Sequence, residues 1–311
     1  MNVAFVFSGQ GAQYLGMGRE FYTNSLIFKQ FIDQASKVLE LDIPQLMFEE
    51  EEKLNQTEYT QPVILAMSVA ISEMVKDSLG IKPVISAGLS LGEYTALVES
   101  GSLDFETALK LVRKRGKLMQ EAVPQGVGAM TAVMGMDRET IQSICEEASS
   151  VAGVYPANYN MPGQIVIGGY KEGVAKAEEL LAEAGAKRLI PLQVSGPFHT
   201  PLLKEASENL EAVLNEITFK EMTIPVVTNV TGKVIPSKEE IVSTLTKQVM
   251  SPVYFEDCVK EMINEGVDTF IEIGPGKTLT SFIKKIDKTV KTQNCEDQKT
   301  FEKLEKLISN Q

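Results

Sequence analysis

The sequence predicts an α/β protein with a parallel central sheet and a smaller unit inserted into it. Three observations lead to this prediction. Short apolar runs typical of buried strands alternate with longer segments of helical periodicity over most of the 311 residues. An apolar run at 84–85 leads through a glycine-rich turn into a helical pattern at 94–98, as in a strand, a tight turn and a helix. Between 126 and 197 the order changes to strand, helix, strand, strand, helix, strand.

The N-terminal part is predicted to be one strand followed by helices. Residues 2–7 form the apolar run of a buried strand, and 8–13 follow as a flexible polar turn. Apolar positions in 25–39 recur at the spacing of one helix face, and 61–79 is apolar enough for a buried helix. Asp104 is placed to cap a long helix that reaches about residue 122.

One serine stands at the apex of the glycine-rich turn, in the run Gly88-Leu89-Ser90-Leu91-Gly92. A nucleophile at a sharp strand-to-helix turn sits in strained backbone, and the flanking glycines let neighbouring chain approach without Cβ clashes. The helix that begins beside Ser90 also directs unpaired N–H groups at negative charge developing there. The pattern therefore favours a nucleophilic serine in an α/β-hydrolase-like core, with an ordinary βα turn and an incidental serine as the alternative.

The inserted unit begins where the composition changes, at 124–128. We expect strands at 129–134, 151–157, 164–167 and 187–193, helices at 138–148 and 173–184, and a turn at 158–163. This βαββαβ order is that of a split-βαβ, ferredoxin-like unit. Because the strand–helix alternation resumes afterwards, we expect a discontinuous catalytic core of residues 1–125 and 198–311 with an inserted subdomain of 126–197.

The C-terminal part returns to the alternating pattern of the core. We predict helices at 200–217, 237–249, 255–265, from 277 onward and at 298–308, with strands at 224–228, 268–273 and 289–292. The sequence contains no internal repeat, low-complexity tract or long linker. These segments are therefore assigned to the same core as the N-terminal part.

Composition and charge disfavour several classes of function. The formal charge of −12, from 42 acidic and 30 basic residues, argues against nucleic acid and anionic membranes as partners. Nothing approaches the about 20 apolar residues of a membrane span, and no signal peptide is evident. The cysteines lie far apart and the chain has 1 histidine, so no metal site is predicted. We therefore expect a cytoplasmic protein with reduced thiols.

The sole histidine, His199, is the candidate base for Ser90. A serine hydroxyl is a poor nucleophile without a base. His199 follows the last strand of the inserted unit, where the chain re-enters the core through Gly196 and Pro197. Loops that bridge two domains face the cleft between them, where ligand sites concentrate. This placement strengthens the case for a catalytic histidine, with an incidental one as the alternative.

Short sequence blocks between residue 2 and about residue 285 carry the most specific information. They are Phe7-Ser8-Gly9-Gln10-Gly11-Ala12-Gln13, Gly88-Leu89-Ser90-Leu91-Gly92-Glu93-Tyr94, Arg115-Gly116-Lys117-Leu118-Met119-Gln120, Gly196-Pro197-Phe198-His199, Gln248 with Pro252-Val253, and Ile273-Gly274-Pro275-Gly276-Lys277. In content and order these blocks resemble the malonyl-CoA:acyl carrier protein transacylase family. The resemblance implies transfer of a malonyl group from malonyl-CoA to the phosphopantetheine thiol of holo-acyl carrier protein, feeding fatty acid biosynthesis, with no bound cofactor.

The resemblance also implies the catalytic roles. Ser90 would take the malonyl group as an oxygen ester, and His199 would remove its proton and later activate the incoming thiol. The backbone N–H groups of Gln10 and Leu91 would form the oxyanion hole. In the family a backbone carbonyl at the position matching Gln248 orients the imidazole, so the system works as a Ser-His dyad.

Arg115 and Phe198 would shape the acyl pocket. In the family the arginine matching Arg115 pairs with the free malonyl carboxylate. A planar guanidinium can donate two hydrogen bonds to a carboxylate and suits this pairing better than lysine does. Without the resemblance, the cationic run at 113–117 is typical of a solvated helix face, and Gln248 is typical of a solvated helix end. Phe198 would narrow the pocket. Leu89 departs from the family, where many members have histidine, and this bears on pocket shape and selectivity.

Two other functions fit part of the sequence. A serine esterase or thioesterase of the α/β-hydrolase type places its histidine late in the chain, whereas further predicted strands follow His199 here. The positive charge of Arg115 would also be unfavourable deep in a pocket that binds neutral esters. A non-enzymatic acyl-carrier-binding or scaffold domain would have no use for Ser90, His199, Gln10 and Arg115 together. The transacylase interpretation is preferred.

The expected partners are malonyl-CoA and an acyl carrier protein, and the protein is expected to be a monomer. Carrier proteins of the family are acidic, so a chain of charge −12 needs a local cationic rim that outweighs the global repulsion at short range. Candidates are Lys187 with Arg188, Lys284 with Lys285, and whichever of Arg113, Lys114 and Lys117 face outward.

Overall fold

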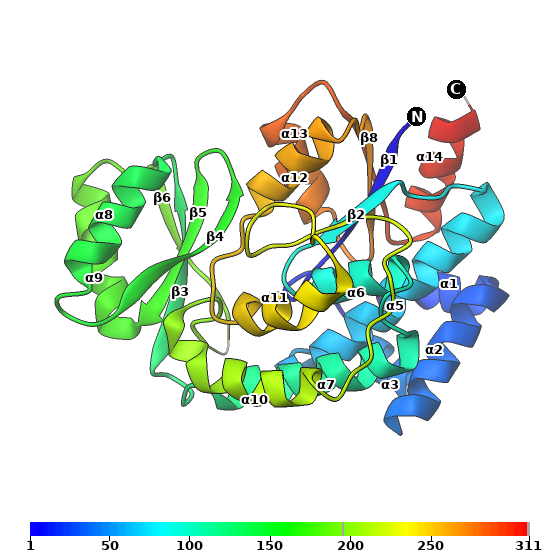
Figure 1. The fold of residues 1–311 in the computed structure, drawn as a ribbon, viewed down its shortest axis with the longest axis horizontal. Coiled ribbons are helices and arrows are strands. Elements are labelled where there is room, and N and C mark those ends of the chain that lie inside the picture. The colour runs from blue at the N-terminus through cyan, green and yellow to red at the C-terminus, as the bar shows by residue number, and fades with distance from the viewer. Residues whose placement is uncertain (195, 310–311) are drawn as a thin grey trace.

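The apolar runs of the sequence become the strands of two separate sheets (Figure 1). The computed structural model describes residues 1–194 and 196–309, and in this part of the chain the sheets have five and four strands. The larger sheet is parallel throughout and has the order β7-β2-β1-β8-β9. Its strands are β1 (Val3–Phe7), β2 (Ile85–Gly88), β7 (Val226–Val227), β8 (Thr269–Ile273) and β9 (Lys291–Cys295).

Helices cover the parallel sheet and follow the predicted order. Before the inserted unit they are α1 (Arg19–Asn24), α2 (Leu26–Leu39), α3 (Ile43–Phe48), α4 (Glu51–Leu54), α5 (Thr57–Leu79), α6 (Leu91–Glu99) and α7 (Phe105–Glu121). After it they are η1 (Pro201–Leu203), α10 (Lys204–Leu214), η2 (Lys238–Glu240), α11 (Ile241–Gln248), α12 (Phe255–Asn264), α13 (Thr278–Ile286) and α14 (Gln298–Ser309). The predicted cap is confirmed, because the Asp104 carboxylate accepts from the N–H groups of Glu106 and Thr107 at the start of α7.

The inserted unit has the predicted βαββαβ order. It comprises β3 (Gly128–Met134), α8 (Arg138–Ala148), β4 (Val154–Met161), β5 (Gln164–Tyr170), α9 (Lys171–Glu183) and β6 (Arg188–Pro191). Its strands are antiparallel in the order β4-β5-β3-β6. This is the ferredoxin-like arrangement, so the predicted fold class is confirmed. The division into 1–125 with 198–311 and 126–197 stays a prediction.

The turn predicted at 158–163 lies between the middle strands as expected, but it is shorter than predicted. Strand β4 continues to Met161, with Asn158 paired to Val166 and Met161 to Gln164, so the turn is confined to residues 162–163. Asparagine favours turns, but here the gain from cross-strand pairing outweighs that preference. The register shifts beside Asn158 and Tyr159 show where the strand accommodates the irregular sequence.

Other boundaries differ from the prediction at element ends. Helix α5 begins at Thr57 rather than at residue 61, so Pro62 lies inside it. The predicted helix at 200–217 is divided into η1 and the shorter α10, and the predicted strand at 224–228 shrinks to β7. The predicted strand at 289–292 is shifted to β9. The bounds of β7 and β9 follow their pairing with β2 and β8.

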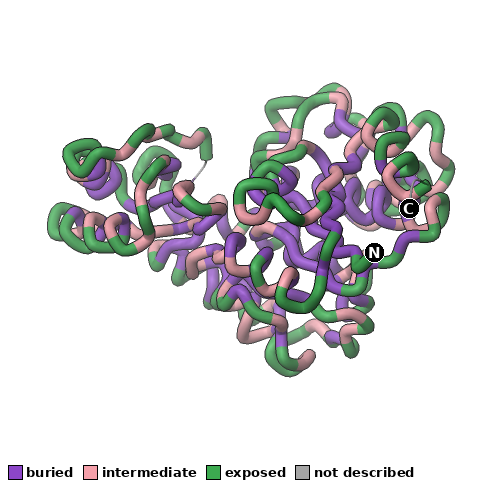
Figure 2. The backbone as a smooth tube through the Cα atoms, turned by 90° about the horizontal axis from the view of Figure 1, so that it is seen from above, coloured by how far each residue is buried: buried purple, intermediate pink, exposed green. Residues whose placement is uncertain are grey.

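The parallel sheet is buried on both faces. Along β1, Phe5 and Phe7 belong to the core shared with α2, α5 and α7, whereas Ala4 and Val6 belong to the core shared with α12 and α13. This alternation places successive side chains on opposite faces, as β geometry requires. Buried segments run through the middle of the larger body in Figure 2, and exposed chain surrounds them.

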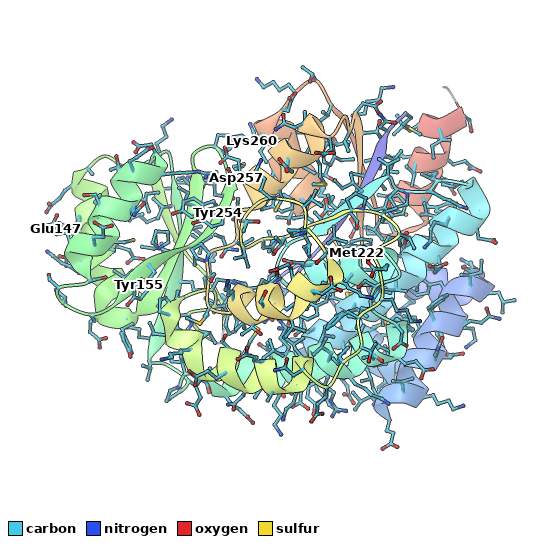
Figure 3. The ribbon with its side chains drawn as sticks, in the orientation of Figure 1. Glu147, Tyr155, Met222, Tyr254, Asp257 and Lys260 are labelled. Carbon is cyan, nitrogen blue, oxygen red and sulfur yellow. The ribbon has the colours of Figure 1, made fainter. Side chains whose placement is uncertain are left out.

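The inserted unit is joined to the larger body along β4. Tyr159 donates its N–H to the Val253 carbonyl at 2.7 Å, and its ring stacks on that of Tyr254 with centroids 4.9 Å apart. Arg138 of α8 pairs with Asp257 of α12 at 2.8 Å. Tyr254 and Asp257, labelled in Figure 3, lie on the side of the larger body that faces the inserted unit. Among the described residues, no helix is both long and apolar enough to cross a membrane.

Candidate active site

Ser90 lies at the sharp turn between β2 and α6. Its backbone has φ 55° and ψ −102°, a conformation that non-glycine residues rarely adopt. The flanking glycines allow this turn. A Cβ on Gly88 would overlap the backbone of Gly92, and a Cβ on Gly92 would overlap the Phe7 carbonyl of β1. The Gly-x-Ser-x-Gly spacing is therefore required by close packing of the turn against the carboxyl ends of β1 and β2.

His199 lies beside Ser90 although the two are far apart in the chain. Its Nε2 is 2.8 Å from the Ser90 Oγ, and its Nδ1 is 2.8 Å from the main-chain oxygen of Gln248. Because a carbonyl oxygen can only accept, Nδ1 carries the proton and the lone pair of Nε2 faces the hydroxyl. Burial and the Arg115 cation lower the pKa of His199 to about 4. The imidazole is thus neutral near pH 7 and able to take a proton.

Arg115 projects from α7 into the interior and is fully buried. Its Nη2 donates to the Ser90 Oγ at 3.0 Å and to the Gln248 Oε1 at 2.9 Å, and its Nη1 donates to the Gln61 Oε1 at 2.9 Å. The guanidinium also lies over the Tyr94 ring, 5.0 Å from the centroid. The solvated-face alternative is therefore wrong for Arg115.

Gln248 is buried at the end of α11, so the solvated-end alternative is wrong there too. Its main-chain oxygen faces the imidazole, and its side chain reaches three other groups. The Oε1 accepts from Arg115, and the Nε2 donates to the Ser90 carbonyl at 3.0 Å and to the Glu93 carboxylate at 2.8 Å. Both ends of this residue therefore contact the dyad.

A cavity of ≈ 620 Å³ opens in front of Ser90 and His199. Its wall combines the loops that follow β1 and β2 with residues of β3, β4 and β5, so it lies between the larger body and the inserted unit. Its lining includes Gln10, Leu89, Met119, Met130, Asn160, Val166, Phe198 and Phe282. Gln10, Phe198 and the atypical Leu89 thus all border the space in which an acyl group would be held.

The oxyanion-hole candidates lie on the two segments that meet beside Ser90. Leu91 is the first residue of α6, where backbone N–H groups lack an intrahelical acceptor. The loop that carries Gln10 abuts the serine turn, since a Cβ on Gly9 would overlap the Leu89 carbonyl. Gln10 itself is anchored by its side chain, which donates to the Thr57 hydroxyl at 3.0 Å.

Sequence reasoning missed two residues that hold the serine turn. Asn229 follows β7 and is buried; its Oδ1 accepts from the Ser90 N–H at 2.6 Å, and its Nδ2 donates to the Gly88 carbonyl at 2.7 Å. Glu93 accepts from the Asn229 N–H at 2.9 Å. The sequence holds a signal for Asn229, because it is a polar residue just after a predicted parallel strand, and ligands of α/β proteins bind at the carboxyl ends of such strands. In the described residues no group of His, Cys, Asp and Glu could hold a metal ion.

Comparison with known proteins identifies the family. The family model described as "Acyl transferase domain" matches residues 4–310. The malonyl CoA-acyl carrier protein transacylase of Bacillus subtilis is 46% identical over 302 residues, covering 96% of this chain and 95% of that protein. The chain belongs to this acyl transferase family. The resemblance and the enzyme class predicted from the sequence blocks are confirmed.

Solved structures agree with this assignment. The MCAT structure from Streptococcus pneumoniae has a TM-score of 0.95 and 52% identity, covering 98% of this chain and 99% of that one. A malonyl-transacylase in complex with its type II PKS acyl-carrier protein has a TM-score of 0.96 and 42% identity, covering 100% of both chains. The acyltransferase therefore shares its whole fold with these proteins.

Most of the predicted cationic rim of the acyltransferase is exposed. Arg188 is the first residue of β6 and Lys187 precedes it, and both are exposed; residues 192–194, which follow β6, line the cavity. Lys284 and Lys285 lie near the end of α13, which also lines it. On α7, Lys114 and Lys117 are exposed, whereas Arg113 is partly buried and pairs with Glu58.

Proposed function

We propose that this acyltransferase moves a malonyl group from malonyl-CoA to the phosphopantetheine thiol of an acyl carrier protein through a malonyl ester on Ser90. The observation that carries the proposal is the contact of the Ser90 Oγ with both the His199 Nε2, at 2.8 Å, and the Arg115 Nη2, at 3.0 Å. One base and one cation thus meet at the nucleophile. The names of its relatives support malonyl-CoA and the carrier protein as substrates.

In the first half-reaction Ser90 is acylated. The Nε2 of His199 takes the hydroxyl proton as the Oγ attacks the thioester carbonyl carbon, and the negative charge moves to the carbonyl oxygen. The N–H groups of Leu91 and Gln10 stabilise that oxyanion. The intermediate then expels the CoA sulfur, which takes the proton from His199, and the malonyl group remains on Ser90.

In the second half-reaction the carrier thiol removes the acyl group. His199 takes the thiol proton as the sulfur attacks the ester carbonyl, and the same oxyanion site is used again. Collapse breaks the bond to Ser90, whose oxygen regains the proton from His199. The Gln248 carbonyl holds the Nδ1 proton throughout, so the imidazole keeps one orientation. The cycle uses these groups and two substrates, and it calls for no bound cofactor.

Arg115 supplies the selectivity for a dicarboxylic acyl group in this proposal. Its Nη2 already reaches the serine oxygen, so a short acyl chain on that oxygen brings its free carboxylate within reach of the guanidinium. A forked donor suits a carboxylate, and pairing offsets the cost of burying the charge. Phe198 and Leu89 narrow the rest of the pocket.

The experiment is to mix the protein with malonyl-CoA, quench, and map the added mass on peptides by mass spectrometry. The expected result is a malonyl adduct on the peptide that contains Ser90, and no adduct with Ser90→Ala. Adding holo-carrier protein is expected to move the label to its thiol faster than buffer removes it. Label lost equally fast with and without carrier protein would instead indicate a thioesterase.

A further inference from the structure

A buried carboxylate lies beside the serine turn and is not among the residues that line the cavity. Glu93 stands three residues after Ser90 on α6 and is fully buried. One of its oxygens, Oε2, accepts two hydrogen bonds. The Asn229 N–H donates to it at 2.9 Å, and the Gln248 Nε2 donates to it at 2.8 Å.

Each of these two donors belongs to a residue that fixes one member of the dyad. The Asn229 side chain holds the Ser90 N–H and the Gly88 carbonyl. The Gln248 main-chain oxygen holds the His199 Nδ1. The loop after β7 and the end of α11 are therefore joined at one oxygen of Glu93, and that oxygen is attached to the helix that starts at the nucleophile.

This connection matters because both members of the dyad have strained backbone. Ser90 has φ 55° and His199 has φ 60°. Such conformations persist only where the surrounding structure holds them in place. The Glu93 oxygen is placed to do so for both residues at once, since it fixes the positions of Asn229 and Gln248 relative to α6.

We propose that Glu93 is a positioning residue for acyl transfer. It acts as a hydrogen-bond acceptor that keeps Ser90 and His199 in position relative to each other. The proposal rests on the proposed reaction at Ser90. It requires the acceptor oxygen and not the negative charge, so a neutral amide of the same shape can replace the carboxylate. The aligned dyad affects the chemical step, whereas the binding of CoA esters in the cavity does not depend on it.

The same helix supplies a matched control. Glu99 lies at the end of α6 and its side chain is only 6% exposed. It pairs with Lys76 at 3.0 Å and accepts from the Ser72 hydroxyl at 2.5 Å, and neither partner contacts the dyad. Glu99→Ala therefore removes a buried carboxylate from α6 without removing a link to Ser90 or His199.

The experiment compares Glu93→Gln, Glu93→Ala, Glu93→Asp and Glu99→Ala with the wild-type protein. Malonyl-CoA and holo-carrier protein are the substrates, and the rate per functional site comes from titrating Ser90 with malonyl-CoA by intact-protein mass. The melting temperature is measured for every variant. A wild-type protein that takes no malonyl group would reject the proposed function itself, before the variants are compared.

For Glu93→Ala we expect kcat per functional site to fall about 10- to 100-fold, with KM for malonyl-CoA changed less than about 3-fold, because misalignment affects the chemical step. Glu93→Gln is expected to stay within about 3-fold of wild type, since the amide oxygen accepts from the same donors. Glu99→Ala is expected to keep the wild-type rate per site even where its melting temperature falls.

Two outcomes would overturn the inference. One is a wild-type rate per functional site in Glu93→Ala, with only stability or the number of functional sites reduced. The other is an equal loss in Glu93→Gln and Glu93→Ala, which would assign the effect to the charge. If Glu93→Ala does not fold, Glu93→Asp decides. Its oxygens are withdrawn by one methylene, so a slowed rate per site supports positioning and a wild-type rate rejects it.

Discussion

Replacement of Arg115 tests whether this residue binds the free carboxylate of the malonyl group or is needed for the transfer of any acyl group. The guanidinium is fully buried and its Nη2 is 3.0 Å from the Ser90 Oγ, the atom that carries the acyl group in the proposed intermediate. Arg115→Ala removes the cation that faces a malonyl carboxylate. Arg115→Lys keeps a positive charge but loses the planar fork.

The expected magnitude follows from the contact. A hydrogen bond to a charged group contributes about 1.5–3 kcal/mol, which corresponds to about 10- to 150-fold in rate. Leaving the malonyl carboxylate buried without a partner adds to this loss. We therefore expect Arg115→Ala to reduce kcat/KM for malonyl-CoA by about two decades or more. Acetyl-CoA has no carboxylate, so its kcat/KM is expected to be retained or raised.

The assay measures kcat/KM for malonyl-CoA and acetyl-CoA in wild type, Arg115→Ala and Arg115→Lys, with carrier protein held constant. The ratio of the two values cancels any shared damage to Ser90, His199 or folding. Arg115→Lys is expected to give a ratio between those of wild type and Arg115→Ala. An equal loss for both thioesters would show that Arg115 supports the fold or the dyad and does not read the carboxylate.

Three further predictions concern the dyad, its pH dependence and docking. Ser90→Ala is expected to abolish acyl-enzyme formation. The double variant Ser90→Ala with His199→Ala is expected to have nearly the same kcat as Ser90→Ala alone, because the effects of residues in one catalytic unit are not additive. Near-additive losses in kcat would contradict this. Because the pKa of His199 is lowered to about 4, the base stays neutral down to that pH. Activity is expected to fall as the pH drops through about 4, where His199 becomes protonated. In Arg115→Lys this fall is expected at a higher pH, because the shorter side chain holds its charge farther from His199 and lowers the pKa of the imidazole less. A wild-type midpoint near 6.5 would contradict the buried-base account. Charge reversal at Lys187 and Arg188 is expected to raise the KM for carrier protein and to leave the rate of acylation by malonyl-CoA unchanged. If the KM for carrier protein and its dependence on salt do not change, these two residues are not part of the docking site.

The fold was predictable where local pattern and tertiary pairing agree. The glycine spacing around Ser90 and the packing at the carboxyl ends of β1 and β2 require the same strand, turn and helix. The βαββαβ order defines the inserted unit. The pattern failed at Asn158, whose turn preference was outweighed by pairing with Val166 in the neighbouring strand. Weak local signals are overridden wherever a long-range partner satisfies the backbone.

The site was predictable from motifs but not from the residues taken singly. Arg115 has cationic neighbours, and only its helical spacing from Leu111 and Met119, on the buried face of α7, distinguishes it as the side chain that faces inward. Gln248 contacts His199 through its main-chain oxygen, an interaction that no side-chain pattern can encode. Asn229 and Glu93 are joined by a contact between segments far apart in the chain, so the end of a predicted strand could indicate Asn229 as a candidate but not its partner.

A single-turnover chase shows whether the malonyl group passes through Ser90 on its way to the carrier thiol. Malonylated protein is freed of malonyl-CoA, mixed rapidly with holo-carrier protein, and both proteins are followed by intact mass. We expect malonyl to leave the enzyme and arrive on the carrier at one rate, which is at least as fast as steady-state turnover. Release slower than turnover would exclude the malonyl-Ser90 ester as an intermediate, because an ester that decays more slowly than turnover cannot lie on the path.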